Sequence, residues 1–377
     1  MNKDIIISNL IKSNCIKTGI YTLKSKELSK YYFNIKNLIS YPKVLKEIGD
    51  AIYQQLDDFD IICAIPHGSM PLVSYISTTY NKKMIFIRDS VKTYGTKNQI
   101  EGEYNKNDKC VILDDVITSG NSLQDVFNVL KNQINIVQVF TVIDRQQLCT
   151  LLPFKVDSLL TKTDIVRYRL MKISQEKNSR LIFSADLECV EKMLHILEKV
   201  GQYIVVCKIH LDIYKIIDKI DFFKKLIDLS IKYDFLLMED RKFNDIGYIV
   251  QKQYQRFSSI IDLVTVHGSA NPSILQYLSG SIIVSNMSNS NDVYNDKALK
   301  MVEQYSKHII GFVSQYRFKY VSKDNMIFMT PGISLIEGTN DDQHYKITKN
   351  VDTDFYIVGR SIYNSSNIYE TIKAFQT

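Results

Sequence analysis

Long apolar runs, paired cysteines and clusters of basic residues are missing from this sequence of 377 residues, and glycine (14) and proline (6) are scarce. No stretch of about 18 apolar residues occurs, and the first residues lack the apolar core and small-residue cleavage site of a signal peptide, so we expect no membrane partner. The six cysteines lie far apart without a C-x-x-C pair, most of them inside apolar runs. They predict a reducing, cytoplasmic setting and no structural zinc.

Charge is not concentrated either. The formal net charge is +6; residues 1–170 carry 22 Lys and Arg against 17 Asp and Glu, and residues 171–377 carry 25 against 24. Because nucleic-acid-binding proteins usually show basic stripes, this small excess predicts no nucleic acid partner, and it fits a small polyanionic ligand. Hydrophobic residues at 45% and charged residues at 23% are typical of a folded chain that is long enough for one large domain or two ordinary ones.

Two patterns of secondary structure follow one another and predict an α/β protein with two domains, 1–170 and 171–377. In the first, strand-like runs alternate with helical stretches, which is typical of a parallel sheet. These runs are 60–65, 84–87, 109–113, 136–143 and 155–160. In the second, eight short β-rich runs recur, as a small (β/α)8 barrel requires. They are 181–184, 203–207, 235–238, 262–266, 281–284, 309–313, 326–329 and 355–358. No glycine or proline occurs in 164–179, so a flexible tether is not expected there.

The most specific motif of the first domain is the run 111–122, in which an apolar strand leads into two carboxylates and a small-hydroxyl loop that opens a helix. Such a loop can present backbone N–H groups and hydroxyls to a phosphate at a helix N-terminus. The residues that would do so are Thr118, Ser119, Gly120 and Ser122. Asp114 and Asp115 would repel that phosphate, so we expect them to face sugar hydroxyls or a magnesium ion. The alternative is that the run 111–122 is only a strand, a turn and an N-capped helix, with no role in phosphate binding.

The run resembles the phosphoribosyl-pyrophosphate (PRPP) motif of the type I phosphoribosyltransferases, and other segments resemble orotate phosphoribosyltransferase. Those segments are Leu23-Lys24-Ser25, 88–92, 94–97, 101–102 and Asp144-Arg145. The resemblance implies a type I phosphoribosyltransferase fold, orotate and PRPP as substrates, and Mg2+ as a cofactor carried on PRPP, near Asp114 and Asp115 without direct protein ligands. The residues that it implies in substrate binding are Lys24, Arg88, Lys92, Tyr94, Asp114, Asp115, Thr118, Ser119, Gly120, Asn121, Ser122 and Arg145.

Within that set, the resemblance implies that Lys24, Arg88 and Lys92 neutralise the pyrophosphate, with Lys92 a catalytic residue on a mobile flap. It implies that Thr118 and Arg145 hold orotate. Two positions depart from the family: Asp89 replaces a second basic flap residue, and Lys26 replaces a glycine. These departures motivate an alternative in which the first domain is a PRPP-binding regulatory or structural module without catalytic activity.

The second domain carries the motif D-x-K-x-x-D within the run 238–247, after an apolar strand. Asp240 and Lys242 are expected on one face because side chains alternate along a strand, and Lys208, at the end of the preceding strand, is expected to meet them. Surface salt bridges between lysine and aspartate are frequent. A surface salt bridge does not require such charges at the ends of consecutive strands, so we favour the interpretation that these residues share a pocket.

This array resembles the active site of orotidine 5′-monophosphate decarboxylase, an enzyme that requires no cofactor. The resemblance implies catalytic roles for Lys242, Asp240, Asp245 and Lys208. It implies that Asp186, His210, Ser288, Pro331, Gln343, Tyr345, Gly359 and Arg360 bind substrate. Lys242 would protonate C6 of the base; Asp186 and Lys208 would hold the ribose; Gln343, Tyr345 and Arg360 would hold the phosphate. Asp245 would reach the neighbouring site of a homodimer.

The two resemblances cover almost the whole chain, in the order transferase then decarboxylase. They imply that orotate and PRPP give orotidine 5′-monophosphate and pyrophosphate, and that the nucleotide then gives UMP and CO2, the last two steps of de novo pyrimidine biosynthesis. Ile249, where the family usually has threonine, and Met287-Ser288-Asn289, in place of a Ser-Ser pair, depart from the pattern. The alternative for this domain is a metal-dependent 3-keto sugar phosphate decarboxylase or synthase, since those barrels share the D-x-K-x-x-D motif.

Overall fold

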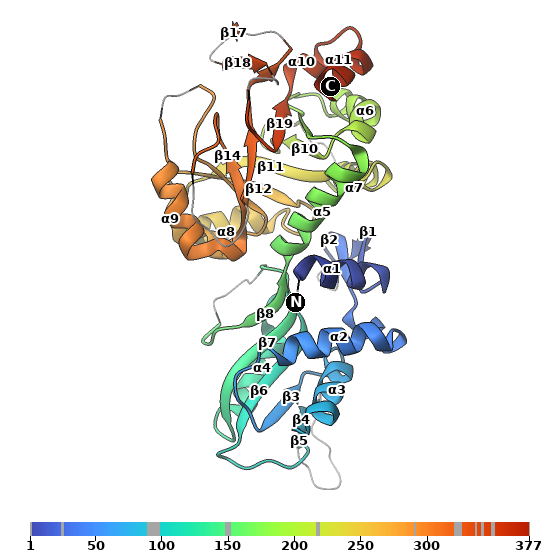
Figure 1. Cartoon of the computed structure of the whole chain (residues 1–377), viewed down its shortest axis with the longest axis vertical. Helices are drawn as coiled ribbons and strands as arrows, with labels where there is room; N and C mark the ends of the chain where they lie inside the picture. Colours follow the sequence, from blue (N-terminus) through green and yellow to red (C-terminus); the bar gives the residue numbers. More distant parts are fainter. Residues whose placement is uncertain are drawn as a thin grey trace. The chain divides into compact units, whose positions relative to one another are not determined.

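A computed structural model gives the arrangement of helices and strands along the chain (Figure 1). The residues that it describes are 2–23, 26–88, 99–147, 152–215, 219–289, 292–319, 326–335, 338–340, 343–347 and 351–376. The segment that was expected to form the transferase flap, with Asp89, Lys92 and Tyr94, lies outside these residues, as does Lys24.

The chain divides into two compact units. The first contains Met1–Lys17 and Tyr32–Ile165, and the second contains Thr18–Tyr31 and Val166–Thr377. The expected division after residue 170 falls inside helix α5 (Lys162–Lys177), which continues through it. The larger difference from the expected domains 1–170 and 171–377 is the segment Thr18–Tyr31, which packs with the second unit although it lies near the start of the sequence.

The first unit is built on a six-stranded sheet in the order β5-β4-β3-β6-β7-β8, parallel except for the β4–β5 pair. Its strands are β3 (Ile61–Ala64), β4 (Lys83–Ile87), β5 (Ile100–Glu101), β6 (Lys109–Ile117), β7 (Asn135–Asp144) and β8 (Asp157–Thr161). Its helices are α1 (Lys3–Lys12), η1 (Ile35–Ser40), α2 (Pro42–Tyr53), α3 (Met70–Tyr80) and α4 (Asn121–Leu130). Every residue of β3 is buried, as a parallel sheet with both faces covered requires.

The second unit is a closed barrel of eight parallel strands, in the order β9-β10-β11-β12-β13-β14-β15-β19, which confirms the predicted (β/α)8 fold. Its strands are β9 (Leu181–Ser184), β10 (Val206–Ile209), β11 (Leu236–Phe243), β12 (Leu263–His267), β13 (Ser281–Val284), β14 (Ile309–Val313), β15 (Ile327–Thr330) and β19 (Phe355–Val358). Its helices are α6 (Val190–Val200), η2 (Gly201–Tyr203), α7 (Lys219–Lys232), α8 (Gly247–Gln255), η3 (Pro272–Tyr277), α9 (Asn295–Tyr305), η4 (Ser306–His308), α10 (Arg360–Tyr363) and α11 (Ile368–Gln376), and α5 continues into it.

Two small sheets complete the fold. The strands β16 (Ile333–Ser334), β17 (Gly338–Asn340) and β18 (Gln343–Ile347) form a three-stranded sheet in the connection between β15 and β19. The strands β1 (Ile16–Thr22) and β2 (Leu28–Phe33) form a hairpin. The part of this hairpin that belongs to the second unit is Thr18–Tyr31.

The barrel encloses one apolar core, and a second core lies between the strands and the surrounding helices. The inner core includes Val206, Leu236, Met238, Ile282 and Met329. The short barrel strands β9, β10, β13, β15 and β19 are buried along their whole length because both of their faces are covered. This packing holds the carboxyl ends of the strands in fixed positions, where barrel enzymes place their chemistry.

In the described part of the chain, no helix has the length and apolar character needed to cross a membrane. The cytoplasmic location stays a prediction.

Candidate active site

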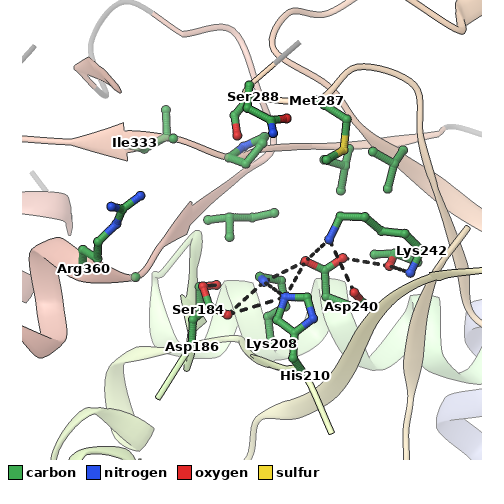
Figure 2. Close-up of a pocket in the computed structure, with 18 of the residues that line it drawn as sticks. Ser184, Asp186, Lys208, His210, Asp240, Lys242, Met287, Ser288, Ile333 and Arg360 are labelled. Atoms are coloured by element: carbon green, nitrogen blue, oxygen red, sulfur yellow. Dashed lines mark hydrogen bonds and ion pairs between the residues drawn. The ribbon is translucent and has the colours of Figure 1, made fainter. Parts of the chain in front are cut away.

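A cavity of about 540 Å³ opens at the carboxyl ends of the barrel strands (Figure 2). Strand β9 contributes Ser184 to its wall, β10 contributes Lys208, β11 contributes Asp240 and Lys242, and β12 contributes Thr265. The structure therefore brings together the three charged residues that the sequence pattern placed in one pocket.

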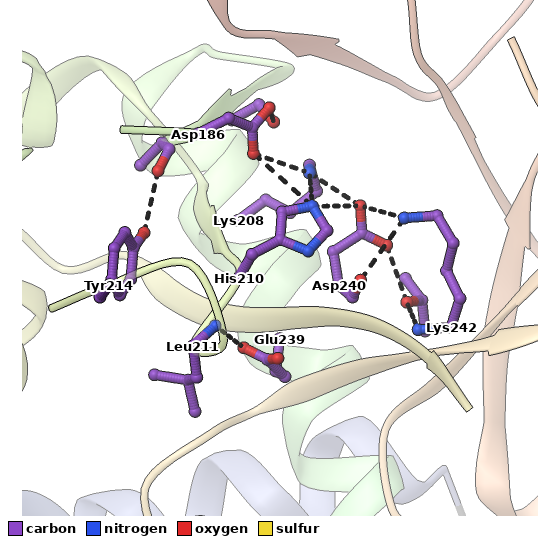
Figure 3. A network of polar contacts seen from close by, with 11 residues as sticks. Asp186, Lys208, His210, Leu211, Tyr214, Glu239, Asp240 and Lys242 are labelled. Atoms are coloured by element: carbon purple, nitrogen blue, oxygen red, sulfur yellow. Dashed lines mark hydrogen bonds and ion pairs between the residues drawn. The ribbon is translucent and has the colours of Figure 1, made fainter. Parts of the chain in front are cut away.

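Asp240 is the centre of a compact array of charges (Figure 3). Its Oδ2 lies 2.7 Å from Nζ of Lys208 and 3.0 Å from Nζ of Lys242. Lys208 also lies 3.3 Å from Oδ1 of Asp186, and Nε2 of His210 lies 3.3 Å from Oδ2 of Asp240. Two ammonium groups and two carboxylates thus alternate along one wall of the cavity, and we call Asp186, Lys208, Asp240 and Lys242 the upper array.

The neighbouring charges outweigh the effect of burial on both central members of this array. Burial by itself would raise the pKa of Asp240, but Lys208, His210 and Lys242 hold it well below its usual range. Burial would lower the pKa of Lys208, but Asp240 and Asp186 raise it above its ordinary value. Asp240 is therefore a carboxylate and Lys208 an ammonium at neutral pH.

Strand β11 reaches this geometry through an irregularity that the sequence argument did not foresee. The ladder with β12 pairs Glu239 with Val264 and then Phe243 with Val266, so three residues of β11 oppose one residue of β12. Lys242 adopts φ +54°, in the left-handed region. Asp240 and Lys242 do line one cavity, but regular strand alternation is not the reason, because the strand bulges between them.

Several predicted binding residues line the same cavity. They are Asp186, His210, Ser288, Pro331, Tyr345, Gly359 and Arg360. The Arg360 guanidinium lies over the ring of Tyr345, 5.7 Å from its centroid, so these two side chains lie together in the cavity wall. A Cβ on Gly359 would lie 3.0 Å from the carbonyl oxygen of Ser184, so a larger residue would crowd strand β9. The side chain of Gln343 lies outside the described part of the structure.

Asp245 is not among the described residues that line the cavity of its own chain. It is exposed, at the start of the turn before α8, and its carboxylate accepts a hydrogen bond from the backbone N–H of Ile246. Ile246 and Tyr248 beside it are large apolar residues that are 68% and 63% exposed. The predicted approach of Asp245 to a neighbouring copy stays a prediction.

Sequence reasoning missed several residues of the cavity, among them Thr265, Asn286, Ser361 and Tyr363. Thr265 had a signal that could have been used, because it is the one polar residue inside the apolar run 263–266. The other three lie after strands, where polar residues are common for reasons of turn geometry alone.

The first unit carries the second candidate site at the end of β6 and the start of α4. Asp114 is buried and Asp115 is half-buried. Gly120 adopts φ +82°, and Asn121 and Ser122 after it are exposed at the first turn of α4. A Cβ on Gly68 would lie only 1.9 Å from Oδ2 of Asp115, so glycine is required for the carboxylate to occupy this position. The loop that the sequence predicted is thus present, with Thr118 and Ser119 half-buried within it.

Burial, and for Asp114 also the neighbouring carboxylate, raises the pKa values of Asp114 and Asp115. Oxygen donors of this kind suit a magnesium ion or sugar hydroxyls, either of which would relieve the repulsion between the two groups. Of the predicted basic residues, Arg145 is buried, with its guanidinium 5.5 Å from the centroid of the Phe33 ring, and Arg88 forms an ion pair with Glu101. Lys26, in the segment Thr18–Tyr31 of the second unit, adopts φ +65°, a backbone conformation that glycine favours.

Comparison with known proteins gives matches for both units. The "Orotidine 5'-phosphate decarboxylase / HUMPS family" matches residues 179–375, and the "Phosphoribosyl transferase domain" matches residues 34–162. "Uridine 5'-monophosphate synthase" of Bos taurus is 27% identical over 460 residues, covering 98% of this chain and 95% of that protein.

Two single-domain relatives match one unit each. "Orotate phosphoribosyltransferase" of Methanocaldococcus jannaschii is 37% identical over 148 residues, covering 38% of this chain and 84% of that protein. "Orotidine 5'-phosphate decarboxylase" of Schizosaccharomyces pombe is 31% identical over 217 residues, covering 52% of this chain and 81% of that protein. Because the first family model accounts for more than half of the residues, the chain belongs to the orotidine 5'-phosphate decarboxylase / HUMPS family, with a phosphoribosyl transferase domain before the barrel.

Proposed function

We propose that the protein catalyses two consecutive reactions of pyrimidine biosynthesis. The first unit transfers the ribosyl phosphate of PRPP to orotate, giving orotidine 5′-monophosphate and pyrophosphate. The barrel then converts that nucleotide to UMP and CO2. The observation that carries the proposal is the upper array, in which the ammonium groups of Lys208 and Lys242 lie 2.7 Å and 3.0 Å from the Asp240 carboxylate, in a cavity large enough for a nucleotide.

The upper array suits decarboxylation because it places an ammonium group where negative charge develops. When the bond between C6 and the carboxylate breaks, CO2 leaves and the electron pair stays on C6. The pyrimidine ring does not delocalise this pair well, so a fixed positive group must stabilise it. The Lys242 ammonium supplies that charge and then its proton to C6. Ionised Asp240, 3.0 Å away, keeps the ammonium in place between reactions.

Other residues of the cavity would hold the parts of the nucleotide that do not react. We assign the ribose hydroxyls to Asp186 and Lys208, and the phosphate to Arg360 with Tyr345 and Gln343. A phosphate bound far from C6 supplies binding energy that orients the base over Lys242. His210, Ser288, Pro331 and Gly359 complete the binding surface, with Ser288 near the base.

For the first unit we assign the phosphate of PRPP to the loop Thr118 to Ser122 and its ribose to Asp114 and Asp115. Arg88 and Lys92 would neutralise the pyrophosphate, Tyr94 would belong to the same flap as Lys92, and Arg145 with Thr118 would hold orotate. The two raised carboxyl pKa values fit a cation at this place. Magnesium on PRPP would supply further neutralisation of the leaving pyrophosphate.

We also propose that the protein works as a homodimer in which Asp245 completes the site of the partner subunit. Its exposed position outside the cavity and the exposed apolar side chains of Ile246 and Tyr248 support this arrangement. A decarboxylase site of one chain would then be complete only in the dimer.

One set of assays tests the two reactions separately. With orotate, PRPP and magnesium, we expect pyrophosphate, CO2 and UMP; with orotidine 5′-monophosphate alone, we expect CO2 and UMP in the presence of a chelator. Absence of pyrophosphate at saturating PRPP, with decarboxylation intact, would reduce the first unit to a binding module. Loss of decarboxylation in the chelator would favour the metal-dependent 3-keto sugar phosphate reaction instead.

A further inference from the structure

Thr265 occupies a position in the barrel that connects the two reactive residues of the upper array. It lies in the middle of β12, is 1% exposed, and lines the cavity. Its Oγ1 accepts a hydrogen bond from the backbone N–H of Lys242 at 2.9 Å and donates one to Oδ1 of Asp240 at 2.8 Å. One hydroxyl group therefore contacts both the carboxylate and the backbone that carries the reactive lysine.

The bulge in β11 explains why a side chain is needed here. Between the pairs Glu239–Val264 and Phe243–Val266, the residues Asp240, Arg241 and Lys242 oppose Thr265 alone. The ladder cannot supply a backbone acceptor for each N–H group of such a bulge, and a buried N–H without a partner is costly. The Thr265 hydroxyl accepts from the Lys242 N–H and so stabilises the left-handed conformation of that residue, φ +54°.

The same hydroxyl fixes the orientation of the Asp240 carboxylate. Oδ2 faces the cations, with Lys208 at 2.7 Å, Lys242 at 3.0 Å and His210 at 3.3 Å, whereas Oδ1 faces Thr265. Rotation of the carboxylate about its Cβ–Cγ bond would exchange these partners and move Oδ2 away from the two ammonium groups. Lys242 is thus held at both ends, at its backbone N–H by Thr265 and at its ammonium group by Asp240.

We propose that Thr265 is a positioning residue for decarboxylation, acting through Asp240 and Lys242 and not through contact with the reacting atoms. This inference rests on the proposed decarboxylase function. Its consequence is that loss of the hydroxyl lowers kcat more than it raises KM, because the phosphate and ribose contacts are made by other residues.

Two matched pairs of side chains isolate the hydroxyl. Thr265→Val keeps the shape of threonine, and Thr265→Ser differs from Thr265→Ala by the hydroxyl alone. Thr353→Val is the control, because Thr353 is a buried, hydrogen-bonded threonine at the amino end of β19, away from the cavity. Turnover of orotidine 5′-monophosphate, UMP affinity by calorimetry and thermal unfolding are measured for each variant.

We expect kcat to fall by about 100-fold in Thr265→Val, the loss that a displacement of a reacting group by about 1 Å can cause. Thr265→Ser should keep most of the activity, Thr265→Ala should resemble the valine variant, UMP affinity should change little, and Thr353→Val should match the wild type. Equal kcat in the valine and wild-type proteins, or in the serine and alanine variants if valine does not fold, would overturn the inference. A wild-type protein that releases no CO2 would instead overturn the proposed function.

Discussion

Within its described residues, the barrel unit contains a group of lysine and aspartate side chains at each end of the barrel, and the two groups differ in their exposure. The upper array lies at the carboxyl ends of the strands. The lower array, which we define as Lys30, Tyr31, Arg169 and Asp262, lies at the amino ends of β11 and β12. None of the described residues that line the cavity belongs to the lower array. Both groups pair lysine with aspartate, so their differences separate the proposed catalytic site from a structural ion pair.

In the lower array both carboxylate oxygens of Asp262 accept hydrogen bonds from protein groups. Oδ2 of Asp262 accepts from Nζ of Lys30 at 2.6 Å and from the backbone N–H of Leu237 at 2.7 Å, and Oδ1 accepts from the Tyr31 hydroxyl at 2.6 Å. Lys30 and Asp262 have side chains that are 1% and 0% exposed. Such a pair contributes mainly a fixed position for the hairpin Thr18–Tyr31 against the barrel.

In the upper array the contacts are similar in length, but Lys242 is 28% exposed and Asp186 is 41% exposed, both toward the cavity. A lysine whose ammonium group faces a cavity can transfer a proton to a molecule bound there. A lysine that is buried against its carboxylate partner, such as Lys30, cannot reach such a molecule. Exposure to the cavity therefore distinguishes the upper array, which we propose is catalytic, from the lower array.

The largest effect on activity should come from the upper array. Lys242→Ala removes the ammonium that stabilises charge at C6, and we expect decarboxylation to fall by about 10³-fold or more. UMP affinity and the midpoint of denaturant unfolding should remain near their wild-type values, since the side chain is partly exposed and, among the described residues, its ion pair is with Asp240. Turnover within about tenfold of wild type would remove Lys242 from the proton-donor role.

The lower array should show the opposite behaviour. Lys30→Met leaves the Asp262 carboxylate buried without its ammonium partner, which destabilises a protein by about 3–5 kcal/mol. We expect urea unfolding at a lower midpoint, with decarboxylase turnover per folded molecule unchanged. The double variant Lys30→Met/Asp262→Asn should recover part of the loss, because the Asp262 charge is removed together with that of its Lys30 partner. An unchanged midpoint in Lys30→Met would contradict the role of this pair.

Subunit mixing tests whether the upper array is complete within one chain. Lys242→Ala and Asp245→Ala are each expected to be inactive as decarboxylases. After random exchange at equal amounts, half of the dimers would be mixed and each would contain one intact site, so about a quarter of the wild-type activity should return. No recovery after exchange has been demonstrated by labelled subunits would argue against a shared site.

Glu239 is a buried carboxyl group of the barrel that, unlike Asp240 and Asp262, is not held in its charged form by neighbouring cations. Its substitution should have the smallest of the expected effects. Glu239 accepts a hydrogen bond from the backbone N–H of Leu211 at 3.0 Å (Figure 3). Burial raises the pKa of Glu239 to about 7, whereas cations lower the pKa values of Asp240 and Asp262. Because the folded-state pKa lies above the ordinary value of 4.5, stability from this group is complete below pH 4.5 and is lost as pH rises through about 7.

The variant Glu239→Gln keeps an acceptor oxygen and does not ionise. Its free energy of unfolding relative to wild type should therefore increase between pH 5 and pH 8, by no more than about 3 kcal/mol. Urea unfolding at several pH values measures this difference, with Glu303→Gln on the exposed side of α9 as a control. A difference that does not change with pH would show that burial does not govern this carboxyl group.

The eight barrel strands and the pairing of Asp240 with Lys208 were predictable because each is indicated by a pattern of a few neighbouring residues. Short apolar runs at regular intervals indicate the strands, and charges directly after neighbouring runs meet at one edge of a parallel sheet. The bulge in β11 was not predictable, because nothing in the run Met238 to Phe243 distinguishes a regular strand from one that places Lys242 at positive φ. The role of Thr265 follows from that bulge and was hidden with it.

The lower array was hidden for a different reason. Lys30 and Asp262 are separated by 232 positions in the sequence, and of the two only Asp262 lies in a predicted strand, 262–266. A contact of this kind has no local periodicity. The expected division after residue 170 therefore assigned the hairpin to the first domain, whereas its tip region packs with the barrel unit.

The sequence by itself determined the order of the two folds, the charged residues at the carboxyl ends of the barrel strands, and ten of the 22 described residues that line the cavity, because these depend on runs and spacings of a few residues. Only the tertiary structure decided which buried lysine is open to a cavity and which is closed, where the first unit ends, and how a single hydroxyl holds the reactive pair. Those features depend on contacts between segments that are distant in the sequence. The free energy of each contact depends on how deeply its polar and charged groups are buried, which a pattern of neighbouring residues does not indicate.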